Sequence, residues 1–259
     1  MVLAIDEKGH RTIICLQDMV ADIFYTLLSF PLFIGMGRRE LENIVTKTKF
    51  SFHTLHEGDT IVDTDTRSGM MVMLTDGTAV ATTFSDDKGY RVEEEINGPM
   101  LVQPEYVFGL AQHFSQLWKA KTVCHLITLD KQEILKLSDN SLIFRLNLLN
   151  LLSTQVQKRQ ALFWHAPLHT DEEFLRRFFL VHSIRPAGRK VVHIKISRLE
   201  KELNIDRRRL SAVLRQWEQQ GLVEWTRGCL IIPALEKIIN NSLTPSKPIA
   251  LPQPNSLVP

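Results

Sequence analysis

The sequence predicts an α+β fold made of three consecutive parts: an N-terminal antiparallel β-roll, a long helix, and a C-terminal helix pair with a β-hairpin. Three observations predict it. Apolar and polar residues alternate in several short runs between residues 50 and 130, which is typical of antiparallel strands. No proline or glycine interrupts residues 141–164. Helix-capping residues and turn glycines then divide residues 197–232 into two short helices and two β-rich runs.

The composition is that of a globular protein with an uneven distribution of charge. The chain has 259 residues, of which 44% are hydrophobic and 23% charged, which allows one large or two modest domains. Residues 1–170 contain 16 Lys and Arg against 20 Asp and Glu, whereas residues 171–243 contain 14 against 9. This asymmetry predicts that only the C-terminal part meets a polyanion.

The cysteines and the N-terminus argue against several classes of protein. Cys15, Cys124 and Cys229 lie far apart and outside any Cys-x-x-Cys pair, so neither a disulfide framework nor a zinc site is indicated. We expect buried thiols in a reducing compartment, with a redox-sensing cysteine as the alternative. The first residues lack the basic region of a secretory signal, and no segment approaches the ~20 apolar residues of a membrane helix. The expectation is a cytoplasmic protein without a membrane partner.

The first 130 residues are expected to form a helical lead-in and the β-roll. Residues 16–33 and 38–45 have the apolar spacing of helices. The strands are expected within residues 50–62, 70–84, 90–96 and 121–130, with hairpin turns at Gly58-Asp59, at Asp76-Gly77 and at residues 86–89. Several short strands at regular spacing favour a small antiparallel barrel or roll.

Residues 131–165 are predicted to form one long helix that joins two chains in a homodimer. Its seam residues recur at alternating steps of four and three, which keeps one side facing a partner helix over about three heptads. We assign to this dimer interface Leu142, Leu146, Leu149, Ser153, Val156 and Phe163, with Gln160 between the last two. The alternative is a single core helix packed on its own domain.

After Pro167 the chain predicts a compact C-terminal part and a tail. Residues 171–184 have the apolar side of a helix, and residues 191–196 form a short β-rich run. Residues 244–259 hold five of the eleven prolines and no glycine, so we expect a disordered tail. The expected divisions of the chain are residues 1–130, 131–165, 166–243 and 244–259.

The second half of the C-terminal part has the signals of a winged helix-turn-helix. Ser197 and Glu200 have capping-box spacing at the start of a short helix, and Asp206 caps a second helix. The inward stripe of this second helix consists of Leu210, Val213, Leu214 and Trp217. Gly221 suits a left-handed helix stop. Residues 222–232 contain two β-rich runs around an Arg-Gly turn, which predicts a hairpin.

Three consecutive arginines occupy the first turn of this second helix. Cationic side chains there oppose the helix dipole by ~0.3–1 kcal/mol each when exposed, so a helix made only for solubility would carry Glu. Residues 185–215 hold ten Lys and Arg against three acids. We therefore expect the helix to enter the major groove of double-stranded DNA. Candidate DNA-binding residues are Arg207, Arg208, Arg209, Ser211 and Arg215 on the helix, with Lys195, Arg198 and Arg227 at the phosphate backbone. The alternative is a solvated charged face.

The order of roll, long helix and winged helix-turn-helix resembles the Crp/Fnr superfamily of bacterial transcription regulators. The resemblance spans roughly residues 30–240 and is carried by 58-GDTI-61, 71-MVMLTDGTAV-80 and 119-KAKTVCHLITLDKQEI-134. The stretches 106-YVFGLAQ-112 and 207-RRRLSAVL-214 are similar to an enterobacterial branch that includes the inhibitor of hydrogen-peroxide resistance. The resemblance implies a cyclic-nucleotide-binding-like roll, a homodimer, transcription regulation linked to stress response, and RNA polymerase as a partner.

The chain departs from this family where cyclic nucleotides bind. Members that bind them carry Gly-Glu-Leu, whose acid holds the ribose, and Arg-Ser-Ala, whose arginine pairs with the phosphate. Here Leu110 follows Gly109 directly, and Phe114 falls where that arginine is expected. A buried phosphate without a cation is strongly disfavoured, so we expect no cyclic nucleotide. Only Cys15 lies where the Fnr-type branch holds an iron–sulfur cluster, so we expect no cofactor of that kind.

Two other classes of protein stay open as alternatives. Rolls of this kind also hold metal-dependent enzymes, but His53 and His56 are expected on opposite faces of a strand. No catalytic constellation stands out, so we expect neither an enzyme nor a metal site. The other alternative is a regulator whose roll senses haem or a small apolar ligand. The residues considered for that pocket are Phe108, Leu110, Phe114 and Trp118, which we expect instead to fill the interior of the roll.

Overall fold

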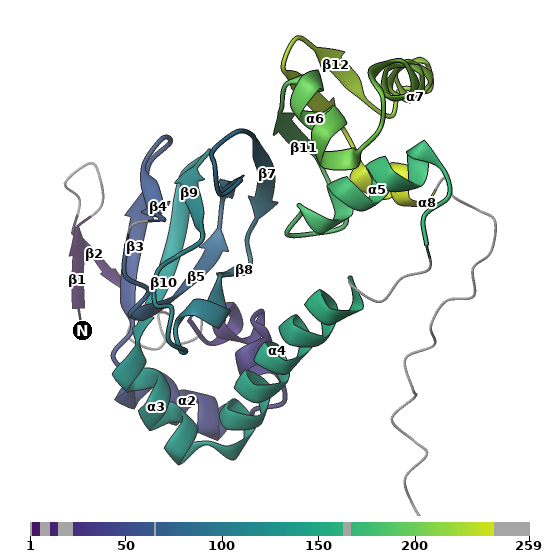
Figure 1. Ribbon diagram of the computed structural model, residues 1–259. Coiled ribbons are helices and arrows are strands. Elements are labelled where there is room, and N and C mark those ends of the chain that lie inside the picture. Colours follow the sequence, from purple (N-terminus) through teal and green to yellow (C-terminus); the bar gives the residue numbers. More distant parts are fainter. Residues whose placement is uncertain (1, 6–10, 15–22, 65, 163–166, 241–259) are drawn as a thin grey trace, which may run out of the picture. The chain divides into compact units, whose positions relative to one another are not determined.

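The computed structural model describes residues 2–5, 11–14, 23–64, 66–162 and 167–240 (Figure 1). The chain divides into two compact units, Met1–Pro167 and Leu168–Pro259. At the N-terminus, β1 (Val2–Ile5) pairs antiparallel with β2 (Arg11–Ile14), a hairpin that the sequence pattern did not predict. None of the helices in the described ranges combines the length and the apolar character that a bilayer span needs.

The first unit contains two antiparallel sheets that form the β-roll. One sheet has the strand order β3-β10-β5-β8, and the strands of the other follow the order β7-β6-β9-β4. The bounds are β3 (Ser51–Leu55), β4 (Thr60–Val62), β5 (Met70–Asp76), β6 (Thr78–Phe84), β7 (Arg91–Asn97), β8 (Met100–Val102), β9 (Gln116–Ala120) and β10 (Cys124–Asp130). The strands expected within residues 50–96 and 121–130 are confirmed, whereas β8 and β9 were not predicted.

The hairpin between β5 and β6 turns at Asp76-Gly77, as predicted. Gly77 has a φ of 95°, a conformation that residues with a side chain rarely adopt. A Cβ atom at this position would lie 2.3 Å from the carbonyl oxygen of Val123, which precedes β10. The glycine therefore allows both the turn and the close approach of β10.

Helices close one end of the roll, where Figure 1 shows α2, α3 and α4 gathered together. Residues 23–28 are helical, and they are followed by η1 (Pro31–Phe33) and α2 (Arg38–Lys47), while η2 (Pro104–Tyr106) follows β8. The buried side chains between these helices and the sheet of β5 and β10 include Leu27, Phe30, Phe33, Leu41, Met71, Met73, Ile127, Leu129 and Phe144. Residues 16–22, which belong to the first expected helix, lie outside the described residues.

In place of the single helix expected over residues 131–165, the chain forms α3 (Lys131–Asn140) and α4 (Leu142–Ala161). The break is at Ser141, whose backbone is extended (φ −130°, ψ 114°). The Ser141 hydroxyl accepts a hydrogen bond from the backbone N–H of Phe144 at 3.1 Å and donates one to the Glu40 carboxylate at 2.5 Å. Ser141 therefore caps α4 and ties it to α2, a contact with a distant residue that no local pattern indicates.

The second unit has the predicted order of helix, strand, helix pair and hairpin. Its elements are α5 (Asp171–Val181), β11 (Lys190–His193), α6 (Ile196–Leu203), α7 (Arg207–Gln219), β12 (Glu224–Thr226), β13 (Cys229–Ile232) and α8 (Leu235–Asn240). Strand β13 pairs with both β11 and β12. The core of the unit includes Leu175, Phe178, Phe179, Leu199, Leu210, Leu214, Trp217, Leu230 and Leu235. The expected tail, residues 244–259, lies outside the described residues.

The capping box expected at Ser197 and Glu200 is wrong. Helix α6 begins at Ile196 with Lys195 at the N-cap, two residues before the expected N-cap Ser197, and it has no side-chain cap. The capping box of this unit lies instead at the start of α5. There the Thr170 hydroxyl accepts from the backbone N–H of Glu173, and the Glu173 carboxylate accepts from the backbone N–H of Thr170.

Candidate nucleic-acid interface

The first turn of α7 is fixed by a tight connection and a capped start. Asn204 adopts a left-handed conformation (φ 53°) that ends α6. Only Ile205 and Asp206 lie between Asn204 and the start of α7. The Asp206 carboxylate accepts a hydrogen bond from the backbone N–H of Arg208 at 2.7 Å. This bond satisfies one of the backbone donors that a helix start leaves free. The predicted cap is thus confirmed.

The apolar stripe of α7 faces the core of the second unit. Leu210, Leu214 and Trp217 are buried, and Val213 is half-buried. The Trp217 ring lies 6.4 Å from the ring of Phe179 in α5, measured between centroids. The Arg176 guanidinium lies over the same indole at 6.0 Å. These contacts fix the rotation of α7 and so decide which of its side chains reach solvent.

Arg207 and Arg208 are presented to solvent, as predicted. Both are exposed, and within residues 168–240 no acidic side chain forms an ion pair with either guanidinium. Arg215, two turns further along α7, is exposed as well, and Ser211 between them is half-buried. Two unpaired guanidinium groups at a helix N-terminus form a surface that suits an anion or the acceptor atoms of a guanine edge.

Arg209 is also exposed, but it differs from its two neighbours because it has an acidic partner. Its Nε lies 2.8 Å from Oδ2 of Asp171 and its Nη2 lies 2.5 Å from Oδ1, so the guanidinium and the carboxylate form a bidentate pair. Asp171 is the first residue of α5. The sequence pattern missed Asp171, because the two residues are 38 positions apart and no spacing rule links them.

The three cations expected at a phosphate backbone have different surroundings. Lys195 is exposed at the N-cap of α6. Arg198 forms an ion pair with Glu202 at 2.7 Å, one turn along the same helix. Arg227 is exposed in the turn between β12 and β13, and β12 is tied to α7 by a hydrogen bond from the backbone N–H of Trp225 to Glu218 at 3.4 Å. Lys195 and Arg227 are therefore exposed cations of the second unit, whereas Arg198 has an acidic partner of its own.

Helix α4 has an apolar stripe that faces solvent. Leu142, Leu146, Leu149 and Val156 are each between 49% and 64% exposed, and Ser153 is exposed among them. Only Phe144 and Leu148 on this helix are buried. The helix is anchored by the side-chain amide of Asn147, which donates to the carbonyl oxygens of Leu32 and Ile34 at 3.1 and 2.8 Å. A core helix would bury the stripe, so the stripe agrees better with an interface. Phe163 lies outside the described residues.

The residues considered for a pocket in the roll do not gather around one. Phe114 and Trp118 are buried and fill the interior, whereas Leu110 is fully exposed. Phe108 is half-buried, and the Lys131 ammonium lies over its ring at 5.2 Å. The buried Gln103 holds the start of β9, because its Oε1 accepts from the backbone N–H and the hydroxyl of Ser115 at 2.9 and 2.8 Å.

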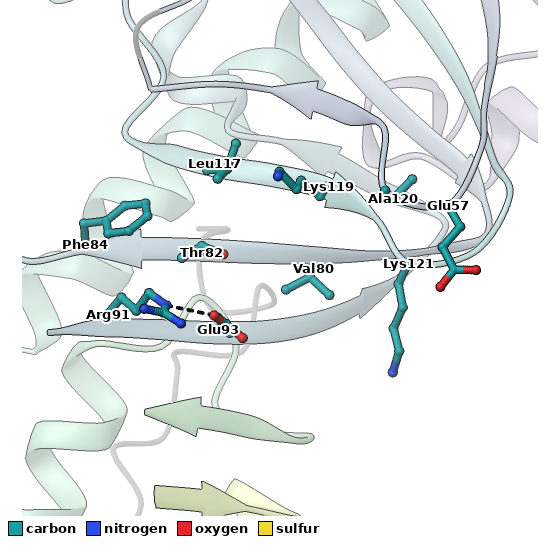
Figure 2. A pocket seen from close by; sticks show the side chains of 11 residues that line it. Glu57, Val80, Thr82, Phe84, Arg91, Glu93, Leu117, Lys119, Ala120 and Lys121 are labelled. Carbon is teal, nitrogen blue, oxygen red and sulfur yellow. Dashed lines mark hydrogen bonds and ion pairs between the residues drawn. The ribbon is translucent and has the colours of Figure 1, made fainter. Parts of the chain in front are cut away.

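A hollow of about 550 Å³ lies over β6, β7 and β9 (Figure 2). Its apolar side chains come from alternate positions of β6 and from β9: Val80, Phe84 and Leu117. Its charged side chains are of both signs, and three of them are paired: Arg91 with Glu93 at 2.9 Å, and Lys121 with Glu95, which lies outside the lining, at 2.7 Å. Because its charges largely offset each other, the hollow favours no particular class of ligand.

The candidate metal ligands of the described ranges form no metal-binding cluster, and the buried Cys124 is not an activated thiol. No three His, Cys, Asp or Glu side chains there are placed to hold a metal ion, and His53 contacts Thr128 at 3.1 Å. Burial, followed by the charge of Asp76, raises the pKa of the Cys124 thiol, which keeps it protonated and weakly nucleophilic. Cys229 is half-buried, and Cys15 lies outside the described residues.

No protein-family model matches the chain, and no curated protein does either. Several solved structures are similar to it. The catabolite activator protein of Thermus thermophilus is 16% identical with a TM-score of 0.45, and the match covers 82% of this chain and 97% of that one. The sensor domain of the transcriptional regulator DNR from Pseudomonas aeruginosa is 16% identical with a TM-score of 0.47, over 58% and 99%. FixK2 from Bradyrhizobium japonicum is 10% identical with a TM-score of 0.42, over 74% and 96%. These structures are of the Crp/Fnr type; the function of this chain rests on its own residues.

Proposed function

We propose that the chain is a homodimeric, sequence-specific DNA-binding transcription regulator of the Crp/Fnr type. The observation that carries the proposal is the first turn of α7, where Arg207 and Arg208 are exposed without an acidic partner in the described part of the second unit. Cations at this end of a helix are unfavourable unless an anion meets them. A DNA duplex supplies phosphates along its backbone and guanine acceptors at the base edges of its major groove.

In this proposal α6, α7 and the β12–β13 hairpin act as a winged helix-turn-helix, with α7 as the recognition helix. Arg207 and Arg208 reach base edges from the N-terminal turn, and Ser211 and Arg215 follow the groove. Lys195, Arg198 and Arg227 hold the phosphate backbone, Arg198 by exchanging Glu202 for a phosphate. The proposed place of action is the cytoplasm, and RNA polymerase is a proposed protein partner.

The solvent-facing stripe of α4 supports the homodimer. Isolated exposed leucines are common, but four apolar residues at heptad spacing on one face favour a second copy of the same helix. In the dimer, the roll (residues 1–130) and the DNA-binding part (residues 166–243) are joined through residues 131–165. Two recognition helices then read half-sites about 34–36 Å apart.

We also propose that the roll binds no cyclic nucleotide. Phe114 occupies the position expected for a phosphate-binding arginine and is buried, so a nucleotide would have to displace the ring and would still lack a cation for its phosphate. Isothermal titration with cyclic AMP and cyclic GMP should give no heat of binding. The link to oxidative or other stress rests on residues 106–112 and 207–214, which resemble the peroxide-resistance branch.

Selection of bound fragments from genomic DNA, with and without peroxide stress, tests the proposed function. We expect enrichment of a two-fold symmetric site whose half-sites are separated by about 10–10.5 base pairs or a multiple of that distance. Affinity for this site should fall steeply with salt, because each phosphate contact releases counterions. The absence of any enriched sequence from the purified, correctly folded dimer would contradict the proposal.

A further inference from the structure

We propose that Arg209 is a positioning residue rather than a DNA contact. Its bidentate pair with Asp171 holds the first turn of α7 against α5 and sets the angle at which Arg207 and Arg208 are presented. The inference rests on the proposed function, and it divides the three consecutive arginines into two roles that their sequence does not distinguish. Two of them face outward, and the third fixes the helix that carries them.

The geometry of the pair suits a fixed contact. Both nitrogen–oxygen contacts are short, and the Asp171 side chain is only 16% exposed although that of Arg209 is 64% exposed. A planar guanidinium that meets both carboxylate oxygens defines an orientation as well as a distance. Lysine cannot reproduce this, because its ammonium group makes a single-point contact.

A second contact between α5 and α7 lies two turns further along α7. The side-chain amide of Gln216 donates to Oε1 of Glu172 at 3.3 Å, and Oε2 of the same carboxylate accepts from Arg176 at 3.1 Å. Consecutive acids at the start of α5 therefore hold α7 at two points, Arg209 and Gln216. Two points along one helix, together with the buried Trp217, leave little freedom for α7 to rotate or tilt.

The charge of Asp171 makes the two roles of Arg209 distinguishable. An acid close to a DNA-facing turn repels phosphates. If Arg209 is itself a DNA contact and Asp171 only competes for it, removal of the Asp171 charge should strengthen DNA binding. If the pair positions α7, removal of the same acid should weaken specific binding although a negative charge is lost. The two roles predict opposite signs for one conservative substitution, Asp171→Asn.

The test measures binding of the full-length protein to its selected duplex and to a scrambled duplex over a series of salt concentrations. We expect Asp171→Asn and Arg209→Gln each to lower affinity for the selected duplex about fivefold, as for the loss of one well-formed pair, with little change for the scrambled one. The double variant should be no weaker than either single variant. Arg209→Lys, which keeps the charge but not the fork, should not restore binding. The slope of log affinity against log salt should stay unchanged, whereas Arg227→Gln, at a proposed phosphate contact, should reduce it by about one.

A different set of results would overturn the inference. These are tighter or unaltered binding by Asp171→Asn, additive losses in the double variant, or full rescue by Arg209→Lys. If the wild-type protein selects no sequence at all, the proposed function fails, and amide hydrogen exchange then decides the role of the pair. If the pair positions α7, the backbone N–H groups of residues 210–212 should exchange faster in Asp171→Asn than in the wild type. The control Lys237→Gln should leave these rates unchanged. Equal rates in the two variants would contradict the positioning role.

Discussion

The Asp206 carboxylate and the backbone N–H of Arg208 lie 2.7 Å apart, so that the acid which caps α7 supports the turn that exposes two arginines. The cap offsets part of the unfavourable interaction between these cations and the helix dipole. It also leaves both guanidinium groups free, because the carboxylate is occupied by the backbone. A cationic helix start is thereby kept folded without neutralising the charges that the proposed function requires.

Loss of this cap should destabilise the second unit. We expect Asp206→Ala to lower the free energy of unfolding by about 1 kcal/mol, because the backbone donor loses its partner. Asp206→Asn keeps an acceptor and should come close to the wild-type value. Urea unfolding of the three proteins measures the difference. Equal stability of the alanine and asparagine variants would show that the hydrogen bond contributes little.

The wing arginine and the recognition helix should affect DNA binding differently. Arg227→Gln removes a proposed phosphate contact, so affinity should fall to a similar degree for selected and scrambled duplexes, and the salt slope should decrease by about one. Fluorescence anisotropy over a salt series measures both quantities. Arg39→Gln, at an exposed position of α2, is the matched control for the lost charge and should change neither. A sequence-dependent loss in Arg227→Gln would assign the wing to base recognition instead.

The stripe on α4 should control assembly without contributing to the fold of a single chain. Leu146→Glu and Leu149→Glu place charges in the proposed interface, so we expect dissociation into monomers, because an unpaired charge is costly to bury. Both side chains are about half exposed in one chain, so the folded monomer should persist. Sedimentation velocity gives the mass and circular dichroism the fold. Gln157→Glu, exposed on the same helix, is the control; dimers of unchanged affinity in the leucine variants would contradict the assignment.

The stability of the second unit should depend on pH through Glu236. A hydrogen bond from the backbone N–H of Gly188, at 2.7 Å from Oε2, lowers the pKa of this carboxyl group below its usual value. A group whose pKa is lower in the folded state stabilises the fold above its unfolded pKa, about 4.3 for Glu, and this stabilisation is lost as the pH falls through the folded pKa.

We therefore expect Glu236→Gln to be less stable than the wild type at pH 7, with the difference shrinking below about pH 4.3. Denaturant unfolding between pH 7 and pH 3 measures it, with Glu224→Gln on β12 as the control. A constant difference across this range would mean that the carboxylate charge has no part in the contact.

The parts of the fold that follow local rules could be predicted from the sequence. Gly77 marks the β5–β6 turn because the turn needs a positive φ, Asp206 marks the start of α7, and Gly221, with a φ of 68°, marks its end. The solvent-facing stripe of α4 follows from heptad spacing alone. Each of these signals depends on residues that are close together in the sequence, so the local pattern is enough to identify it.

The features that the sequence did not predict depend on residues far apart in the chain. The break at Ser141 is held by Glu40, which is 101 positions away, and the direction of Arg209 is set by Asp171. The short strand β8 has only three residues, and its pairing with β5 defines it more than its composition does. Leu110 was expected to line the interior of the roll, but Gly109 turns the loop outward with a φ of 101° and leaves Leu110 in solvent.

The central claim is tested most directly by the affinity of the double variant Arg207→Ala/Arg208→Ala for the selected duplex. Two lost contacts to bases or nearby phosphates should weaken binding by about a hundredfold or more at moderate salt, with the dimer and its thermal stability intact. Binding to scrambled DNA should fall far less. Affinity for the selected duplex equal to that of the wild type would contradict the account, because the exposed turn of α7 would then have no part in recognising DNA.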